Sequence, residues 1–175
     1  MRSGMPALKW RAGYTEAEML SAADNLIPLH LSADNYTPPK SWELAQWCSA
    51  HGADAWSAYV MTIDGRAALF FGHFKEVMAP FSLATASRHL VAAPLWDLNS
   101  ASLAALQDFL TGGIFTYEVG ADGWLEDLTL YRRGELMLGI VSHESEGILR
   151  VSHEERQLLE QGGFPFRAYG PCVGY

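Results

Sequence analysis

The stretch from Gly113 to Gly162 most constrains what this chain can fold into, because its residue pattern predicts an antiparallel meander followed by a helix. Aromatic and β-branched residues predict strands over 114–119 and 124–131. Alternating apolar residues predict two more strands, over 135–142 and 148–151. The stretch therefore predicts a four-stranded sheet.

Turn and cap residues in the same stretch agree with this sheet. Arg132-Arg133-Gly134 predicts a hairpin loop with a positive φ at its glycine. Ser152 and Glu155 form a capping box ahead of a helix that Gly162-Gly163 ends. Period two along 124–131 predicts two opposite faces, with Trp124, Leu128 and Leu130 on one and Leu125, Asp127, Thr129 and Tyr131 on the other.

Cap residues predict three helices in the remainder of the chain. They begin at Thr15, at Thr37 or Ser41, and at Asn99 or Ser100, and they end near Leu26, His51 and Leu110. A short extended piece is expected over 27–31. Asp64-Gly65 predicts a hairpin between strands at 56–63 and 66–72. Residues 74–96 carry mixed signals, with a helical turn fitting 74–78.

These elements predict the α+β class, with the meander and the hairpin in a mostly antiparallel sheet packed by three to four helices. At 175 residues and 49% hydrophobic content, the chain suits one domain over 1–175. We expect a loose N-terminal arm over 1–13 and an irregular tail over 164–175. No apolar run has the length of a membrane-spanning helix or a signal-peptide core, so we expect a cytoplasmic protein without a membrane partner.

The formal net charge is −8, which argues against nucleic acid as a partner because phosphate contacts need clustered Lys and Arg. The charge is also uneven. Ten acidic residues and four arginines lie between Glu118 and Glu160. This excess indicates either an ordinary solvated surface or an acidic surface that a basic partner would bind.

The polar residues offer two candidate sites, each with a simpler explanation. His143, Glu144 and Glu146, with His153 and Glu154, could perform proton transfer or bind zinc or iron if the short strand between them brings them together. A polar turn and a helix N-terminus explain the same residues. Cys48 with His51 could supply a nucleophile, although buried cysteine is commonly a small hydrophobe. We therefore predict no catalytic residue, no metal and no cofactor.

In general character the chain resembles the immunity proteins of bacterial polymorphic toxin systems, through its acidic segments Trp124-Leu125-Glu126-Asp127 and 141–146. The resemblance implies an inhibitor that occludes the active site of a cognate toxin domain, often a basic one. From the charge distribution we expect the following partner-binding residues: Asp122, Glu126, Asp127, Glu144 and Glu146, with Tyr131 and Arg132 as anchors.

Two other functions stay open at this stage. One is an enzyme or small-ligand binder that uses the His143 and His153 end of the sheet, or a cleft near 82–89. The other is a structural subunit whose exposed aromatic surface is covered by a second copy, as a homodimer.

Overall fold

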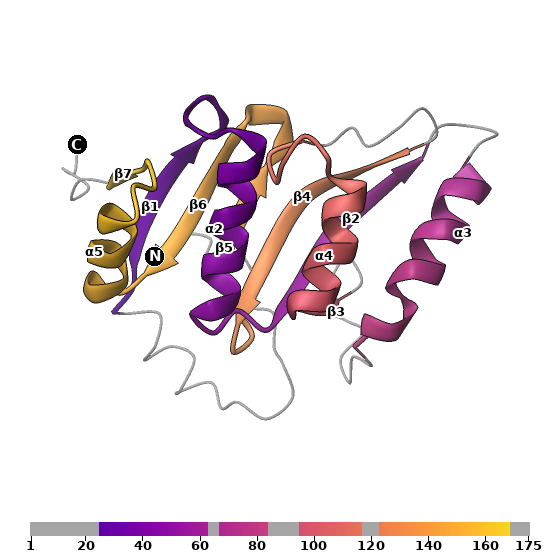
Figure 1. The fold of residues 1–175 in the computed structure, drawn as a ribbon, viewed down its shortest axis with the longest axis horizontal. Helices are drawn as coiled ribbons and strands as arrows, with labels where there is room; N and C mark the ends of the chain where they lie inside the picture. Colours follow the sequence, from indigo (N-terminus) through magenta and orange to yellow (C-terminus); the bar gives the residue numbers. More distant parts are fainter. Residues whose placement is uncertain (1–24, 63–66, 84–94, 117–122, 169–175) are drawn as a thin grey trace, which may run out of the picture.

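In the part of the chain that the structure describes, seven strands form one antiparallel sheet in the order β3-β2-β4-β5-β6-β1-β7 (Figure 1). The structure is a computed structural model that describes residues 25–62, 67–83, 95–116 and 123–168. The strands are β1 Ile27–Ser32, β2 Ala55–Thr62, β3 Trp96–Asp97, β4 Gly123–Arg132, β5 Glu135–Val141, β6 Glu146–Val151 and β7 Arg167–Ala168. The predicted α+β class with an antiparallel sheet is confirmed.

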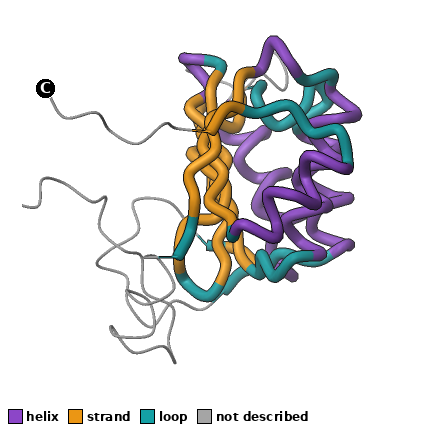
Figure 2. Tube along the Cα trace, turned by 90° about the vertical axis from the view of Figure 1, so that its left-hand side faces the viewer, coloured by secondary structure: helices purple, strands orange, loops and turns teal. Residues whose placement is uncertain are grey.

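The described residues form four α-helices, which lie on one side of this sheet (Figure 2). They are α2 Pro38–Ala50, α3 Ala67–Met78, α4 Ser100–Phe109 and α5 His153–Gln161. Three short 3-10 helices within the described ranges connect these elements: η1 Ala33–Asn35, η2 Ala79–Phe81 and η3 Ser142–Glu144. No described helix covers the other side of the sheet, so the two faces of the strands meet different surroundings.

The core lies between the helices and the sheet. A row of opposed side chains crosses four strands there, with Trp56 opposite Leu130, Leu130 opposite Leu138, and Leu138 opposite Leu149. All four side chains are fully buried. Because side chains alternate between faces along a strand, this row fixes which residues of each strand point away from the helices.

Local cap chemistry sets the beginning of three helices, as predicted. The Thr37 hydroxyl accepts the Lys40 N–H at the start of α2. Asn99 caps α4, and Ser152 with Glu155 completes a capping box at α5. These caps satisfy backbone N–H groups that a first helical turn leaves without a partner.

A β-bulge in β4 corrects one predicted face. The register between β2 and β4 shifts near Asp127, whose φ of 54° lies in the left-handed region. The bulge adds one residue, so the alternation reverses beyond it. Leu125 is therefore buried in the core together with Leu130, and its predicted place on the face of Tyr131 is wrong.

Two predicted strands are replaced by other structure in their described parts, 114–116 and 67–72, while 117–119 lie outside the described residues. Ile114 and Phe115 are buried in a turn after α4, where the Ile114 N–H donates to Ser41 Oγ at 3.1 Å. Their apolar side chains fill the core, but their backbone does not pair with a strand of the sheet. The predicted strand over 66–72 lies largely within α3, where Phe74 and Met78, one helical turn apart, are both buried. Asp64-Gly65 lies outside the described residues.

The two ends of the described chain lie together in the sheet. The predicted extended piece over 27–31 is β1, which pairs with β6 along its length. The tail predicted as irregular contributes β7, which pairs with Leu29 and His30 of β1. Residues 1–24, and with them the predicted arm over 1–13 and most of the helix from Thr15, lie outside the described part, as do residues 84–94 of the open region.

Candidate surface at the turn between β5 and β6

Exposed apolar and acidic side chains lie close together at the turn between β5 and β6. Val141 and Ile148 are 43% and 39% exposed, which makes them two of the large apolar side chains that water reaches. Val141 stands opposite Glu146 in the register, and Ile148 follows on the same face two residues later. We call the group formed by Val141, His143, Glu144, Glu146 and Ile148 the β5–β6 patch.

Hydrogen bonds hold the turn of the patch in one conformation. Ser145 has a φ of 56°, and its N–H donates to the Ser142 carbonyl at 3.2 Å. The Ala33 N–H donates to the Ser145 carbonyl at 2.8 Å and ties the turn to η1, which directly follows β1. On the other side, Asp127 and Ser142 bond to each other. The patch is thus a pre-organised surface.

Two histidines stand against carboxylates of this region. His143 Nε2 contacts the carboxylate of Glu126, and His30 Nε2 lies 3.2 Å from Glu146 Oε2. The Glu126 side chain is only 9% exposed, whereas that of Glu146 is 49% exposed. Of the predicted contact residues, Glu144 and Glu146 are therefore on the surface, and Glu126 is largely buried.

His143 and His153 do not converge. His143 precedes β6 in η3, and His153 follows β6 as the first residue of α5. The six residues of β6 separate them, which at about 3.3 Å per residue is on the order of 20 Å. Among the described residues, no group of three or more His, Cys, Asp or Glu side chains is placed to hold a metal ion.

Tyr131 and Asp127 serve the fold. Tyr131 is 3% exposed, and its hydroxyl lies 3.0 Å from Ser57 Oγ. The carboxylate of Asp127 accepts the Ser142 N–H in the β4 bulge. Both side chains are thus committed to contacts inside the molecule. The predicted contact residue Asp122 lies outside the described residues.

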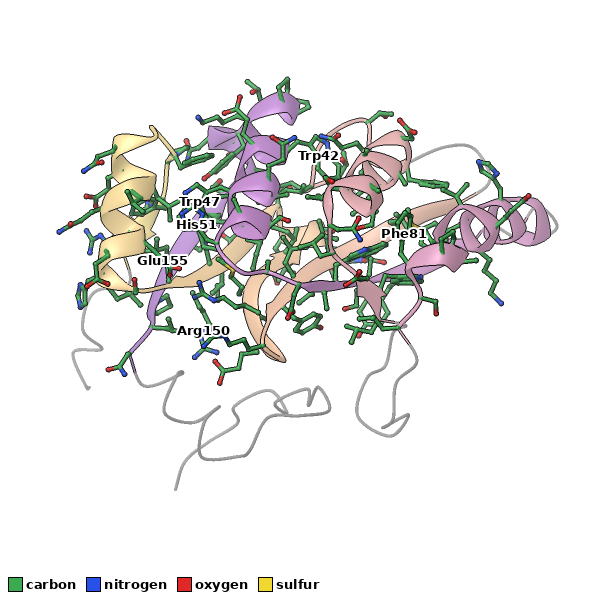
Figure 3. All side chains as sticks on the ribbon, turned by 60° about the horizontal axis from the view of Figure 1, so that its bottom comes forward. Trp42, Trp47, His51, Phe81, Arg150 and Glu155 are labelled. Atoms are coloured by element: carbon green, nitrogen blue, oxygen red, sulfur yellow. The ribbon has the colours of Figure 1, made fainter. Side chains whose placement is uncertain are left out.

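Arg132 joins three elements under the helices. Its guanidinium pairs with the Glu155 carboxylate at the start of α5 and donates to the His51 carbonyl at 3.0 Å. Burial alone would raise the pKa of Glu155, but the Arg132 hydrogen bond, the Ser152 N–H and the Arg132 charge together lower it. Figure 3 shows the same neighbourhood, with Trp47 and His51 on α2 beside Glu155. Arg132 is therefore a structural residue.

The Cys48 thiol is fully buried in the core. Burial, the largest influence, raises its pKa to about 12, so it stays protonated at neutral pH. His51 does not activate it, because its Nδ1 lies 2.8 Å from the Trp47 carbonyl and its ring stacks on that of Trp47 at 3.8 Å. Cys48 is a small apolar core residue.

A hollow of about 300 Å³ lies at the N-terminus of α2. Its polar lining consists mainly of hydroxyl groups, and the Tyr36 and Phe115 rings, 5.4 Å apart, supply its aromatic part. The lining residues are Ala33, Tyr36, Thr37, Pro38, Ser41, Gly112, Phe115, Thr116, Ser142 and Ser145. The alternative cleft near 82–89 lies mostly outside the described residues. From the sequence, Thr37 and Gly112 were explained by helix capping and helix exit, and so did not point to this hollow.

Comparison of the chain with known protein families, with curated proteins and with solved structures finds no match. Within the described residues, no helix combines the length and the apolar character that a bilayer crossing needs. The geometry of the surface therefore carries the functional argument.

Proposed function

We propose that the protein is a non-enzymatic binding protein, an immunity or inhibitor protein that occludes a cognate bacterial toxin domain with its β5–β6 patch. The observation that carries the proposal is the exposure of Val141 and Ile148 beside Glu144 and Glu146. An apolar centre with a charged rim is the usual composition of a protein docking surface.

The two parts of the patch would have different roles. Glu144 and Glu146 attract a basic partner and set its orientation, and the net charge of −8 adds to this attraction. Val141 and Ile148 supply the apolar area that excludes water at the centre of the contact. Because the turn is already fixed, binding costs it little further conformational entropy.

The positions of the reactive residues support binding over catalysis. His143 and His153 stand at opposite ends of β6, and the Cys48 thiol is buried and protonated. The anchors predicted from sequence, Tyr131 and Arg132, are replaced in this proposal by Val141 and Ile148.

The test begins by capturing the partner with the tagged full-length chain at low salt and identifying it by mass spectrometry. The captured protein is then expressed in bacteria with and without this chain. We expect growth arrest without the chain and growth with it. A partner that is harmless when expressed alone would contradict the inhibitor function.

Surface variants then test the patch. We expect Glu144→Lys combined with Glu146→Lys to slow association about tenfold at low salt, and Val141→Asp to accelerate dissociation. Glu76→Lys combined with Asp108→Lys is the matched control, because it changes the net charge equally at two exposed acids on α3 and α4, away from the patch. Equal effects of the control and the patch variants would show that only net charge matters.

The hollow at the start of α2 favours a second candidate function, a binder of a small polar ligand. Hydroxyl groups beside aromatic rings suit a ligand with several hydrogen-bonding groups. A panel of small sugars, polyols and carboxylates can be titrated by NMR. Shifts confined to the amides of Ala33, Thr116 and Ser145 would support this function, and no shifts at millimolar ligand would contradict it.

A further inference from the structure

The outer edge of β2 is open over most of its length. β3 pairs with β2 only at Ala55 and Trp56. From Ser57 to Thr62, β2 pairs with β4 on its inner side, and no described residue pairs with its outer side. In the described structure, every second residue of this six-residue run thus directs its backbone N–H and C=O groups to the outer edge, which is a template for another strand.

The other edge of the sheet is protected. There β7 pairs with Leu29 and His30 in the middle of β1, and Pro28 beside them has no N–H to donate. No long open run is left on β1. In contrast to β1, β2 has no proline and no charged residue over 57–62, and these are two of the usual means of blocking edge pairing.

The sequence of the open edge is suited to pairing. Residues 57–62 read Ser-Ala-Tyr-Val-Met-Thr, without charge, proline or glycine, although the whole chain has a net charge of −8. Tyr59, in the middle of this run, is 42% exposed. The bulge near Asp127 belongs to β4, so β2 itself is continuous. Edge strands normally carry lysine or proline where pairing must be prevented.

We infer that β2 pairs antiparallel with β2 of a second copy of this chain, about a twofold axis near Tyr59. Two molecules of equal negative charge repel, and they can meet closely where their surfaces carry no charge. The edge over 57–62 meets that requirement. A basic partner, in contrast, is attracted to the carboxylates of the β5–β6 patch.

The dimer would join two seven-stranded sheets into one continuous sheet and continue their antiparallel order. Six paired residues match an average strand. Because β4 separates β2 from β5, the β5–β6 patch stays accessible in both copies. The inference is therefore independent of the proposed function, and either can fail alone.

The inference is tested by measuring the molar mass of the full chain by light scattering after size exclusion, over a wide range of protein concentrations. We expect the mass to rise with concentration from 19.3 kDa toward twice that value. Tyr59→Lys places like charges beside the twofold axis and should weaken dimerisation at least about tenfold. Ile148→Lys is the matched control, because Ile148 is also an exposed apolar residue on the face away from the helices. It should leave dimerisation unchanged.

A mass of 19.3 kDa at every concentration would overturn the inference. Equal weakening by Tyr59→Lys and Ile148→Lys would also overturn it, because it would assign the contact to the sheet face. If circular dichroism shows that Tyr59→Lys does not fold, the dimer is tested instead by hydrogen exchange of the wild-type chain. Amides within 57–62 should gain protection as concentration rises, and constant protection would contradict the dimer.

Discussion

Asp127 and Ser142 hold the β4 bulge and the turn after β5 together through two reciprocal hydrogen bonds. The Asp127 N–H donates to Ser142 Oγ at 2.9 Å, and the Ser142 N–H donates to Asp127 Oδ1 at 2.8 Å. Asp127 adopts a positive φ, a conformation that aspartate and asparagine tolerate better than other side chains. One residue thus shapes a strand and fixes the turn of the β5–β6 patch.

Asp127→Ala should therefore lower the free energy of unfolding by about 2 kcal/mol, because the Ser142 N–H loses its acceptor and the backbone strain remains. Asp127→Asn keeps an acceptor oxygen and the tolerance of positive φ, so it should cost less than about 1 kcal/mol. Urea unfolding followed by circular dichroism measures both. Equal losses in the two variants would show that the carboxylate charge is what matters.

Replacement of Arg132 by alanine should cost about 3 kcal/mol, because it leaves the Glu155 carboxylate without its main partner in a largely buried site. The combined Arg132→Ala and Glu155→Ala variant should cost less than the sum of the two single variants. Arg156→Ala is the control, since its pair with Glu160 is exposed and should contribute less than about 0.5 kcal/mol. Additive losses would refute the coupling.

The buried carboxyl group of Glu135 should make the free energy of unfolding fall as pH rises above 4.5. Burial, the largest influence, raises its pKa above the ordinary 4.5, although the charges of Arg150 and Arg132 lower it in part. Just above pH 4.5 the folded chain therefore keeps a proton that the unfolded chain has released, and stability falls as pH rises through this window. Glu135→Gln removes this decline. Its unfolding free energy relative to wild type should increase from pH 4.5 to 7, and a constant difference would contradict the shift.

The Cys48 thiol should resist modification in the folded protein. In the Cys172→Ser background, a thiol reagent at pH 8 should react only as fast as the protein unfolds, because Cys48 is buried and its pKa is about 12. Ala50→Cys in the same background is the control, since Ala50 is exposed on the same helix and its cysteine should react at once. Rapid reaction of Cys48 without denaturant would disprove the assignment.

Features with local causes could be predicted from the sequence. The hairpin after β4 requires positive φ at its tip, and Arg133 and Gly134 have φ values of 53° and 79°. The capping box of Ser152 and Glu155 depends on residues three apart. In such cases the nearby residues contain all the information that the geometry needs.

Features that depend on partners far away in the sequence could not be predicted from it. From the sequence, Glu126 and Arg132 were expected to be charged surface residues. In the structure they pair with His143 and Glu155, which lie on other elements of the fold and are not close to them in the sequence. The strand predicted over 66–72 is helical from Ala67, because this apolar segment packs as α3 on β2 and β4. Tertiary packing outweighed the local strand signal there.

The position of β1 also affects how the chain folds as it is synthesised. β1 pairs with β6, and Ile27 lies opposite Val151, which is made much later in synthesis. The other neighbour of β1 is β7, which follows later in the sequence, beginning at Arg167. A growing chain therefore carries β1 without either neighbour until β6 has left the ribosome, while the β4–β5 hairpin can form as it emerges. The part of the sheet built on β1 is complete only after Ala168 has been made, so β1 is an unpaired strand during the synthesis of more than a hundred residues, a state in which nascent chains are prone to aggregate.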